Sequence, residues 1–305
     1  DCASLTEVTL PQSIRKMGQG VFKDCKSLET ITLPNSINSL PHSTFEGCSN
    51  LKEVNLPTGL TAIATDAFSS CTSLETINIP TGVKTIGSEA FYNCSSLQLV
   101  EFNPTSQLSS IGIRAFKGSG IYAITIPQSV ETIEEQAFED CQLLESLSFA
   151  TGGKLKRIGD GAFQRATKLK GEIILPTGTE KIGSNAFAQC SALEQVTFPQ
   201  NTDTLKSNTF YNCKALRSVT FPTPSKLKVI ESSAMVYSSI ESLDLPEGLE
   251  VIEQGALYAS GSNLRYLHIP STVVSIGERA FGGGNTNGLV VDLDSPIDSV
   301  GEGAL

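Results

Sequence analysis

Residues 67–80 read AFSSCTSLETINIP, and the phrase A-F-x-x-C-x-S-L-x-x-I-x-L-P returns with small changes about every 23 residues. Its second position recurs thirteen times, at Phe22, Phe45, Phe68, Phe91, Phe116, Phe138, Phe163, Phe187, Phe210, Met235, Leu257, Phe281 and Leu305. A unit this short cannot bury its apolar face alone, so each copy must pack against the next. The sequence predicts a repeat solenoid of about 13 rungs of 22–25 residues, in a single domain over residues 1–305.

The rung that follows Phe22 shows how one unit is expected to fold. Leu28, Ile31 and Leu33 give an L-x-x-I-x-L spacing, in which the last two alternate as strand neighbours do. Pro34 ends this main strand because it has no N–H for the ladder. Ile37 then begins a second short extended segment. Stacking of the main strands predicts a continuous parallel β-sheet.

The second segment leads into a turn with its own pattern. In many rungs a glycine follows the segment, at Gly87, Gly112, Gly159, Gly183 and Gly277. Glycine at this position suits a tight turn with positive φ. The next stretch contains the A-F pair and is too short for a regular helix, so we expect one helical or 3₁₀ turn. Successive Phe rings should then stack along the solenoid axis.

Composition limits the possible partners. The formal net charge is -10, the pI is about 4.8, and only 18% of the residues are charged. Nucleic acid and anionic membrane surfaces are therefore disfavoured as partners. No apolar run reaches eighteen residues, so no membrane insertion is expected, and no signal peptide or lipidation motif is visible. Both ends fall within a repeat, which indicates an excerpt truncated within a repeat at both ends.

The eight cysteines share one slot of the repeat. Seven of them follow the repeat Phe by three residues, at Cys25, Cys48, Cys71, Cys94, Cys141, Cys190 and Cys213, and Cys2 has the same phase. Equivalent positions of stacked rungs have parallel side-chain vectors, whereas a disulfide needs facing Cβ atoms. Elsewhere the slot holds small residues, at Ser119, Ala166, Ser238, Ser260 and Gly284. The thiols are predicted to be small buried groups, and the absence of a C-x-x-C pair argues against zinc.

The segments from Val83 to Leu97 and from Val130 to Leu144 resemble the BspA-like leucine-rich repeats. They share the L-x-x-I-x-L-P strand, the I-G-x-x-A-F turn and the C-x-x-L lead into the next strand. The resemblance covers essentially the whole chain. It implies a right-handed solenoid in an extracellular or cell-surface protein that adheres to proteins or glycans on host or neighbouring cells. It transfers no ligand-binding residue, because the family motif is the scaffold.

Candidate binding residues are expected where the motif leaves positions free. The first free position of the main strand gives a partly acidic row, Glu29, Glu75, Glu145, Glu194 and Glu241. This row suits divalent cations or basic partners, or it is a solvated ladder. Near the C-terminus, Arg217, Arg265, Tyr266 and His268 fall on neighbouring rungs. Because Tyr and Arg are enriched at binding hot spots, we favour this patch over the other free positions as the partner-binding site.

Three inserts follow main strands at the same phase of the repeat, at residues 103–106, 150–153 and 222–225. Their Pro, Gly and Ser content indicates turns. Inserts that protrude on one side of a repeat array often form its binding edge, although drift in loop length gives the same pattern.

Catalytic signatures are absent from the sequence. There is no G-x-S-x-G, H-E-x-x-H or phosphate-binding loop, and His42 and His268 are far apart in the array. No catalytic residue, metal site or cofactor is therefore predicted. The first interpretation is a non-catalytic adhesion or recognition scaffold. The alternative is a structural subunit that self-assembles through uncapped ends into an extracellular filament or coat.

Overall fold

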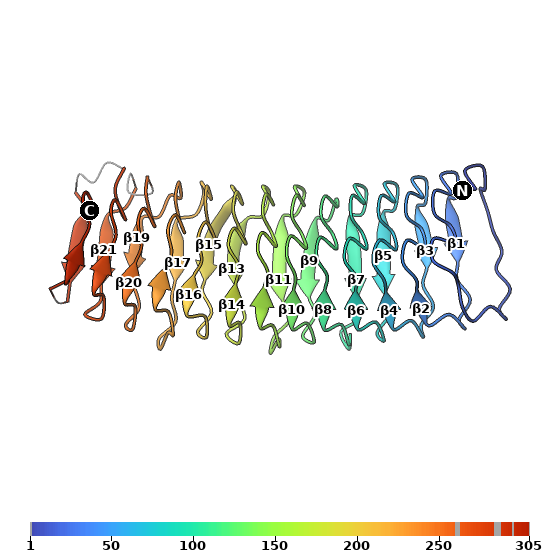
Figure 1. Ribbon diagram of the computed structural model, residues 1–305, viewed down its shortest axis with the longest axis horizontal. Helices are drawn as coiled ribbons and strands as arrows, with labels where there is room; N and C mark the ends of the chain where they lie inside the picture. The colour runs from blue at the N-terminus through green and yellow to red at the C-terminus, as the bar shows by residue number, and fades with distance from the viewer. Residues whose placement is uncertain (1, 260–262, 284–287, 295, 305) are drawn as a thin grey trace. The chain divides into compact units, whose positions relative to one another are not determined.

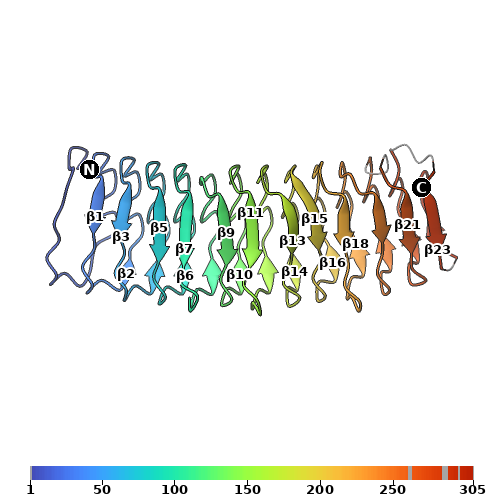
Figure 2. The same cartoon turned by 180° about the vertical axis from the view of Figure 1, so that it is seen from behind.

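Two strand types alternate along the chain in the computed structural model, which describes residues 2–259, 263–283, 288–294 and 296–304. The chain falls into two units, residues 1–153 and 154–305. Each unit is a parallel β-solenoid, in which a main strand and a short second strand follow one another (Figures 1 and 2). The predicted fold class is confirmed, and the number of rungs is close to thirteen. The repeat slots at Ser260, Gly284 and Leu305 lie outside the described residues.

Unit 1 contains strands β1 to β11. Its main strands are β1 (Thr30–Thr32), β3 (Glu53–Asn55), β5 (Thr76–Ile79), β7 (Leu99–Phe102), β9 (Ala123–Ile126) and β11 (Ser146–Phe149). Its second strands are β2 (Ser39–Leu40), β4 (Ala62–Ile63), β6 (Thr85–Ile86), β8 (Ser110–Ile111) and β10 (Thr132–Ile133).

Unit 2 contains strands β12 to β24. Its main strands are β13 (Gly171–Ile174), β15 (Leu193–Thr197), β17 (Ser218–Thr220), β19 (Ser242–Asp244), β21 (Tyr266–Ile269) and β23 (Val290–Leu293). Its second strands are β12 (Arg157–Ile158), β14 (Lys181–Ile182), β16 (Thr204–Leu205), β18 (Val229–Ile230), β20 (Val251–Ile252), β22 (Ser275–Ile276) and β24 (Ser299–Val300).

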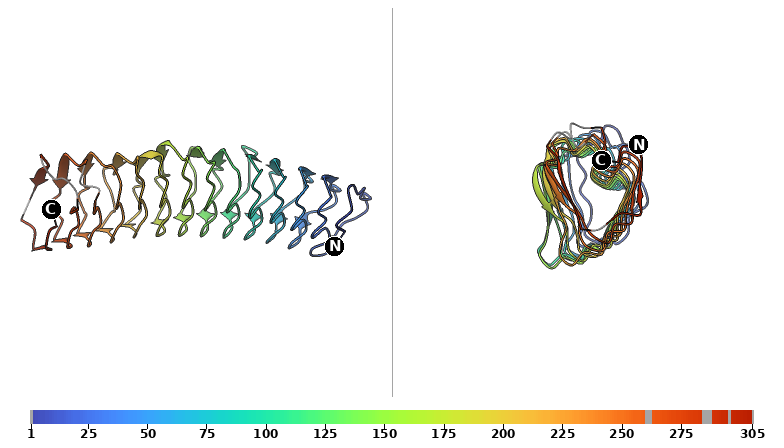
Figure 3. Two further views of the ribbon diagram at one scale, coloured as in Figure 1. Left: turned by 90° about the horizontal axis from the view of Figure 1, so that it is seen from above. Right: turned by 90° about the vertical axis from the view of Figure 1, so that its left-hand side faces the viewer.

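Alternation of side chains places the core inside each rung. In β5, Ile77 and Ile79 are buried, whereas Thr76 and Asn78 face solvent. Buried and exposed residues alternate in a strand that is covered on one face, because successive side chains point to opposite faces. Figure 3 shows the main strands along one side of the rungs and the second strands along another.

The second strands form the longer ladders. In unit 1, β2, β4, β6, β8 and β10 pair in that order and in parallel. The main strands pair in shorter groups, β1 with β3, β5 with β7 and β9 with β11 in unit 1, and β13-β15-β17 and β19-β21-β23 in unit 2. The ladder of main strands is thus divided into groups, but backbone bonds continue between them, since the N–H of Tyr122 before β9 donates to the carbonyl of Gln98 before β7 at 3.3 Å. At β13 the register shifts between Gly171 and Glu172, where the sequence moves its strand by one residue.

The expected helical or 3₁₀ turn is not found in the described residues. Glu89 and Asn93 have φ values of 55° and 54°, in the left-handed region that a right-handed helix does not visit. The N–H groups alternate between two kinds of acceptor. Those of residues 90, 92 and 94 donate to the carbonyl three residues back, at 3.3, 3.1 and 3.4 Å. Those of residues 89, 91 and 93 donate to the next rung, at 2.8, 2.7 and 2.8 Å. The turn is thus a third ladder between rungs.

The role predicted for the turn glycines is wrong. Gly87, Gly112, Gly183 and Gly277 do not have positive φ. Instead, a Cβ atom at Gly112 would lie 2.7 Å from the carbonyl carbon of Gly87 and 2.8 Å from the carbonyl oxygen of Ile86. These glycines therefore permit close approach to the backbone of the preceding rung. The residue with positive φ comes two positions later and is not a glycine in the rung of Gly87, where it is Glu89.

The aromatic slot forms the stack that the repeat predicts. Neighbouring rings from Phe22 to Phe138 in unit 1 have centroids 5.0–5.3 Å apart and interplanar angles of 2–15°. In unit 2, Phe163, Phe187 and Phe210 continue the arrangement at 5.2 and 5.7 Å. These distances match the spacing of paired strands, which is about 4.8 Å. Each ring thus packs against both neighbouring rungs.

The cysteine slot is buried, as predicted, and its thiol also has a polar partner. Seven cysteines are buried, Cys2 is exposed, and all eight are free thiols. The Cys94 Sγ–H donates to the carbonyl of Phe68 in the preceding rung, with an S···O distance of 3.1 Å. Five more cysteines repeat this bond at 2.9–3.2 Å, at Cys48, Cys71, Cys141, Cys190 and Cys213. Burial raises the pKa of Cys94 to about 12, so the thiol remains protonated and able to donate.

Replacing Gly112 with alanine should destabilise the protein by about 1–3 kcal/mol, because the added methyl group would collide with backbone rather than with a movable side chain. Gly18→Ala is the control, since Gly18 has open space and no positive φ. Denaturation by guanidinium, followed by circular dichroism, measures the difference. Equal free energies of unfolding for the two variants would contradict the close-approach role.

In the folded protein at pH 8, Ellman's reagent should modify Cys2 quickly and the seven buried cysteines only after unfolding. The reactive form is the thiolate, and burial raises the pKa of Cys48, Cys94, Cys141 and Cys213 to about 12. Absorbance should report one rapid thiol in native protein and eight in guanidinium. Rapid modification of several thiols in native protein would show that the slot opens without unfolding.

Candidate functional site

A groove lies on unit 1 beside five successive main strands, at the ends of β3 and β5 and along β7, β9 and β11. It joins two hollows that share Asn103, and we name it the insert groove. One hollow adjoins the ends of β3 and β5, and the other adjoins β7, β9 and β11. Two predicted inserts border it, since Asn103 and Pro104 belong to the first and Ala150 to the second. The groove is therefore built where the repeat is interrupted.

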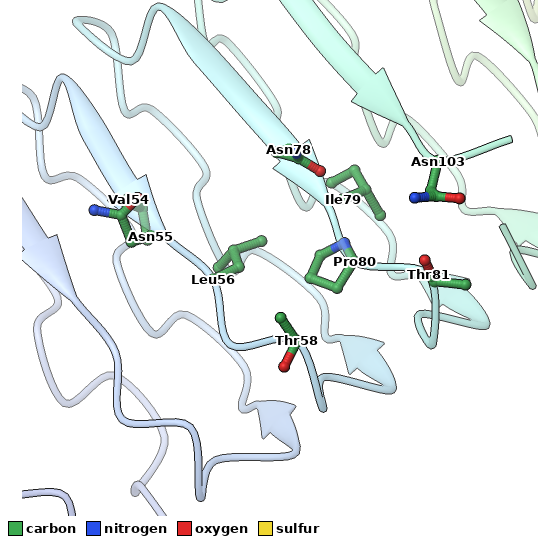
Figure 4. Close-up of a pocket in the computed structure, with 9 residues that line it drawn as sticks. All are labelled: Val54, Asn55, Leu56, Thr58, Asn78, Ile79, Pro80, Thr81 and Asn103. Carbon is green, nitrogen blue, oxygen red and sulfur yellow. The ribbon is translucent and has the colours of Figure 1, made fainter. Parts of the chain in front are cut away.

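The first part of the groove is lined by amides and hydroxyls above apolar side chains. Its volume is about 320 Å³. Figure 4 shows Asn78, Pro80 and Thr81 between Asn55 on the preceding rung and Asn103 on the next. Asn78 faces solvent because it takes an outward position of β5, while the following Ile79 packs in the core. Asn55 and Asn78 come from main strands, whereas Asn103 follows β7 and belongs to the first insert.

The first insert fixes the orientation of Asn103. The Thr105 N–H and Oγ–H donate to Asn103 Oδ1 at 2.9 and 2.7 Å. Both donors need an oxygen, so the amide nitrogen of Asn103 is the atom that remains to donate to a ligand. The N–H of Ser106 donates to the carbonyl of Asn103 at 2.9 Å and closes the turn. The insert is thus a held loop with a defined donor.

The second part of the groove is more apolar and has a volume of about 530 Å³. Leu99 is 44% exposed, and the small Ala123 and Ser146 on the next two rungs leave the space beside it. The Gln128 Nε2–H donates to the carbonyl of Gly152 at 3.3 Å, which ties the second insert to the preceding rung. An apolar hollow rimmed by a few polar groups is the usual form of a ligand site.

The residues that line the insert groove carry no formal charge. Glu101 continues the row of Asn78, with which it pairs in register, but it does not line the groove. An uncharged lining favours neutral polar or apolar ligand groups, because a charged group would lose hydration without a compensating ion pair. The chemistry available is hydrogen bonding by amides and hydroxyls, together with apolar contact.

None of the nine residues predicted as binding sites lines this groove. In unit 1, Glu29 forms an ion pair with Lys52 of the next rung, with 3.0 Å between Oε2 and Nζ, so the charge of the acidic row is partly neutralised. In unit 2, this position holds Arg217, Glu241 and Arg265 on successive rungs. The backbone N–H of Glu241 donates to the carbonyl of Arg217 at 3.1 Å, and that of Arg265 donates to the carbonyl of Glu241 at 2.8 Å. The row therefore alternates in charge there. Its role in cation or partner binding stays a prediction.

The structure gives His268 a structural contact within the predicted patch. Its Nδ1 lies 2.7 Å from Asp244 Oδ1 and its Nε2 lies 3.0 Å from Asp294 Oδ2. Carboxylates accept only, so an imidazole with a carboxylate on each nitrogen satisfies both when both nitrogens carry protons. Tyr266 Oη donates to Asp292 Oδ2 at 3.4 Å. The Asp244–His268–Asp294 contact, which we name the histidine clamp, connects three successive rungs of unit 2.

Sequence inspection found part of this site. The inserts are visible in the sequence as extra residues, but Leu99, Ala123 and Ser146 were not predicted as a group. Their signal is a change of side-chain size across three rungs at one strand position. Among the described residues, no group of three or more His, Cys, Asp or Glu side chains has a geometry that could hold a metal ion. The described part of the chain also has no helix with the length and hydropathy that crossing a membrane requires.

The histidine clamp should make the stability of unit 2 depend on pH. Partial burial lowers the pKa of His268, but the hydrogen bonds with Asp244 and Asp294 outweigh it, and the net pKa is raised. The stabilisation is thus fully present below the unfolded pKa of about 6.5 and is lost as pH rises through the higher folded value. The thermal midpoint of wild type should fall between pH 6 and 8 more than that of His268→Gln. Parallel profiles would contradict a protonated clamp.

The comparisons with known proteins agree on the fold. The model of the BspA type leucine rich repeat region, in 6 copies, matches residues 1–98, 61–171 and 156–287. A crystal structure of a leucine-rich repeat protein from Bacteroides ovatus is 26% identical with a TM-score of 0.69, and the match covers 96% of this chain and 85% of that chain. No curated protein matches.

Two further solved structures are more distant. A leucine rich cell surface protein from Faecalibacterium prausnitzii is 23% identical with a TM-score of 0.45, covering 96% of this chain and 87% of that one. The pneumococcal vaccine antigen PcpA is 20% identical with a TM-score of 0.47, covering 90% and 75%. Because the family model spans nearly the whole sequence and agrees with the stacked rungs, the chain belongs to the BspA-type leucine-rich repeat family.

Proposed function

We propose that the chain is a non-catalytic recognition scaffold that works at a cell surface and adheres to a protein through the insert groove. The observation that supports the proposal most is the groove itself, a pair of uncharged hollows that share Asn103, adjoin five rungs and are bordered by two held inserts. The resemblance to the BspA-type family supports the extracellular setting.

The size of the groove suits a segment of polypeptide. Five rungs at about 4.8 Å each give a length of about 20 Å. An extended peptide of about six residues has this length. Asn55, Asn78 and Asn103 provide hydrogen bonds for the peptide backbone, and Leu99 with Ala123 provides a hollow for an apolar side chain.

The rigidity of the surroundings supports binding. Backbone bonds link rungs at the main strands, the second strands and the turns. A site on such a framework has little conformational freedom to lose when a ligand binds, so more of the contact energy remains as affinity. This argument fits a recognition surface that needs no catalytic group.

Replacing Ala123 with arginine should weaken partner binding at least tenfold without lowering stability. Ala123 is exposed, so a long charged side chain there would fill the hollow and leave the core unchanged. A loss of about tenfold equals 1.4 kcal/mol, within the range of a single disrupted hot spot. Surface plasmon resonance against a panel of purified extracellular-matrix and cell-surface proteins measures the effect.

Gln195→Arg is the matched control, because Gln195 is also exposed on a main strand but lies in unit 2. The double variant Arg265→Ala/Tyr266→Ala tests the patch predicted from the sequence on the same partner. Loss with Ala123→Arg alone supports the groove. Loss with the double variant and none with Ala123→Arg would move the site to the patch, and no binding across the panel would contradict the adhesion proposal.

A further inference from the structure

Three tyrosines gather on the turns of unit 2. Tyr211, Tyr237 and Tyr258 come from three successive rungs, and together with Arg279 of the following rung they line a hollow of about 470 Å³. They are half of the six tyrosines in the chain. The hollow is separate from the main-strand face that carries the predicted patch, because its residues belong to the turns that contain the repeat aromatic slot.

The fold does not require aromatic residues at these positions. Tyr237 has a φ of 60°, and the same slot with the same left-handed backbone holds Asp24, Ser70, Asn93, Asp140, Gln189 and Asn212 in other rungs. Tyr237 is 46% exposed, so its ring adds little to the core. A large aromatic side chain in a left-handed conformation is uncommon, whereas asparagine adopts it readily. The tyrosine is therefore unexplained by the turn alone.

The rings leave aromatic surface available. Tyr211 and Tyr237 meet edge to face, with centroids 5.8 Å apart and planes at 68°. The ring of Tyr258 lies against Gly283, where a Cβ atom would come within 2.6 Å of Cε2. Other rungs show that this slot does not need glycine for its positive φ, so Gly283 provides room for the Tyr258 ring.

Polar groups complete the lining. Ser232, Ser233 and Gln254 contribute hydroxyl and amide groups, and Arg279 contributes the positive charge. The Ser232 N–H and Oγ–H both donate to Glu253 Oε2 at 2.9 Å, which fixes this part of the wall. The Arg279 side chain is 62% exposed and approaches Glu278 through Nε at 3.6 Å. A guanidinium binds a carboxylate through two parallel hydrogen bonds, so Arg279 has the chemistry to hold an acidic ligand group.

We propose that this tyrosine hollow is a second binding site, which takes an acidic sugar residue of a glycan. The C–H face of a pyranose ring packs on Tyr237 and Tyr258, and its carboxylate binds Arg279. Its hydroxyls bind Ser233 and Gln254. A cationic ligand fits less well, because Arg279 would repel it, and a purely apolar ligand would leave the polar lining without partners. The site goes beyond the protein adhesion proposed for the insert groove.

Three small probes separate the contributions to binding. Methyl glucuronide carries both the ring and the carboxylate, methyl glucoside carries the neutral ring, and acetate carries the charge alone. Saturation-transfer NMR titration of the full chain should give the tightest binding for methyl glucuronide. Arg279→Gln should reduce its affinity to that of methyl glucoside while leaving the affinity for methyl glucoside unchanged.

The tyrosine variants test the ring contacts. Tyr237→Asn keeps the turn, since Asn93 and Asn212 occupy this slot elsewhere, and it should weaken methyl glucuronide binding about tenfold, as expected for an aromatic hot spot. Tyr258→Ala should act in the same direction. Tyr92→Ala is the matched control, because Tyr92 also follows the repeat Phe but lies in unit 1, and it should have no effect. Ala123→Arg should have none either, which separates this site from the groove.

Several results would overturn the proposal. Absence of methyl glucuronide binding to wild type would remove the site. Acetate binding as tightly as methyl glucuronide would show an anion site without sugar recognition. Unchanged affinity in Tyr237→Asn, or an equal loss in Tyr92→Ala, would remove the tyrosines from it. Thermal melting of each variant checks that a loss of binding does not come from unfolding.

Discussion

Within each unit, the backbone of a rung lies within hydrogen-bonding distance of its neighbour at the main strand, the second strand and the turn. This spacing of about 5 Å decides which side chain each slot accepts. Stacked flat rings fit it, so phenylalanine recurs at 5.0–5.7 Å. A thiol fits it and also reaches the carbonyl of the rung before. Where the backbones approach most closely, as at Gly112, a Cβ atom has no room.

Much of the fold could be predicted because the same spacing between rungs selects the same residue types in thirteen copies of the repeat. The buried thiols, the Phe stack and the shifted strand at Gly171 each follow from a slot that keeps or changes its spacing. The role of the glycines and the geometry of the turn are not predictable in this way, because a sequence shows that a residue is small without showing what requires it to be small. Gly87 lies so close to the backbone of the preceding rung that a Cβ atom has no room, whereas Glu89 has the positive φ. The alternation of hydrogen bonds that excludes a helix depends on the next rung, which no single unit contains.

The candidate sites could be predicted only in part. Inserts are visible as extra residues, and two of them border the groove. The hollow itself depends on size differences among Leu99, Ala123 and Ser146, which are 23 or 24 residues apart. Charged residues predicted as binding sites have structural partners, as Glu29 has in Lys52 and His268 has in two aspartates. A charged side chain on a stacked sheet lies close to side chains of the adjacent rungs and can pair with them. Its presence alone is therefore weak evidence for a ligand-binding site.

The buried thiols also bear on the order of events during folding. In the unfolded chain every cysteine has an ordinary thiol and is open to oxidation and to mispairing with any other. Once a rung is covered by the next, burial raises the thiol pKa to about 12, as at Cys94, and the chemistry stops. Protection is thus gained one rung at a time as stacking proceeds. In an oxidising compartment, stacking of the rungs therefore competes with disulfide exchange until the thiols are covered.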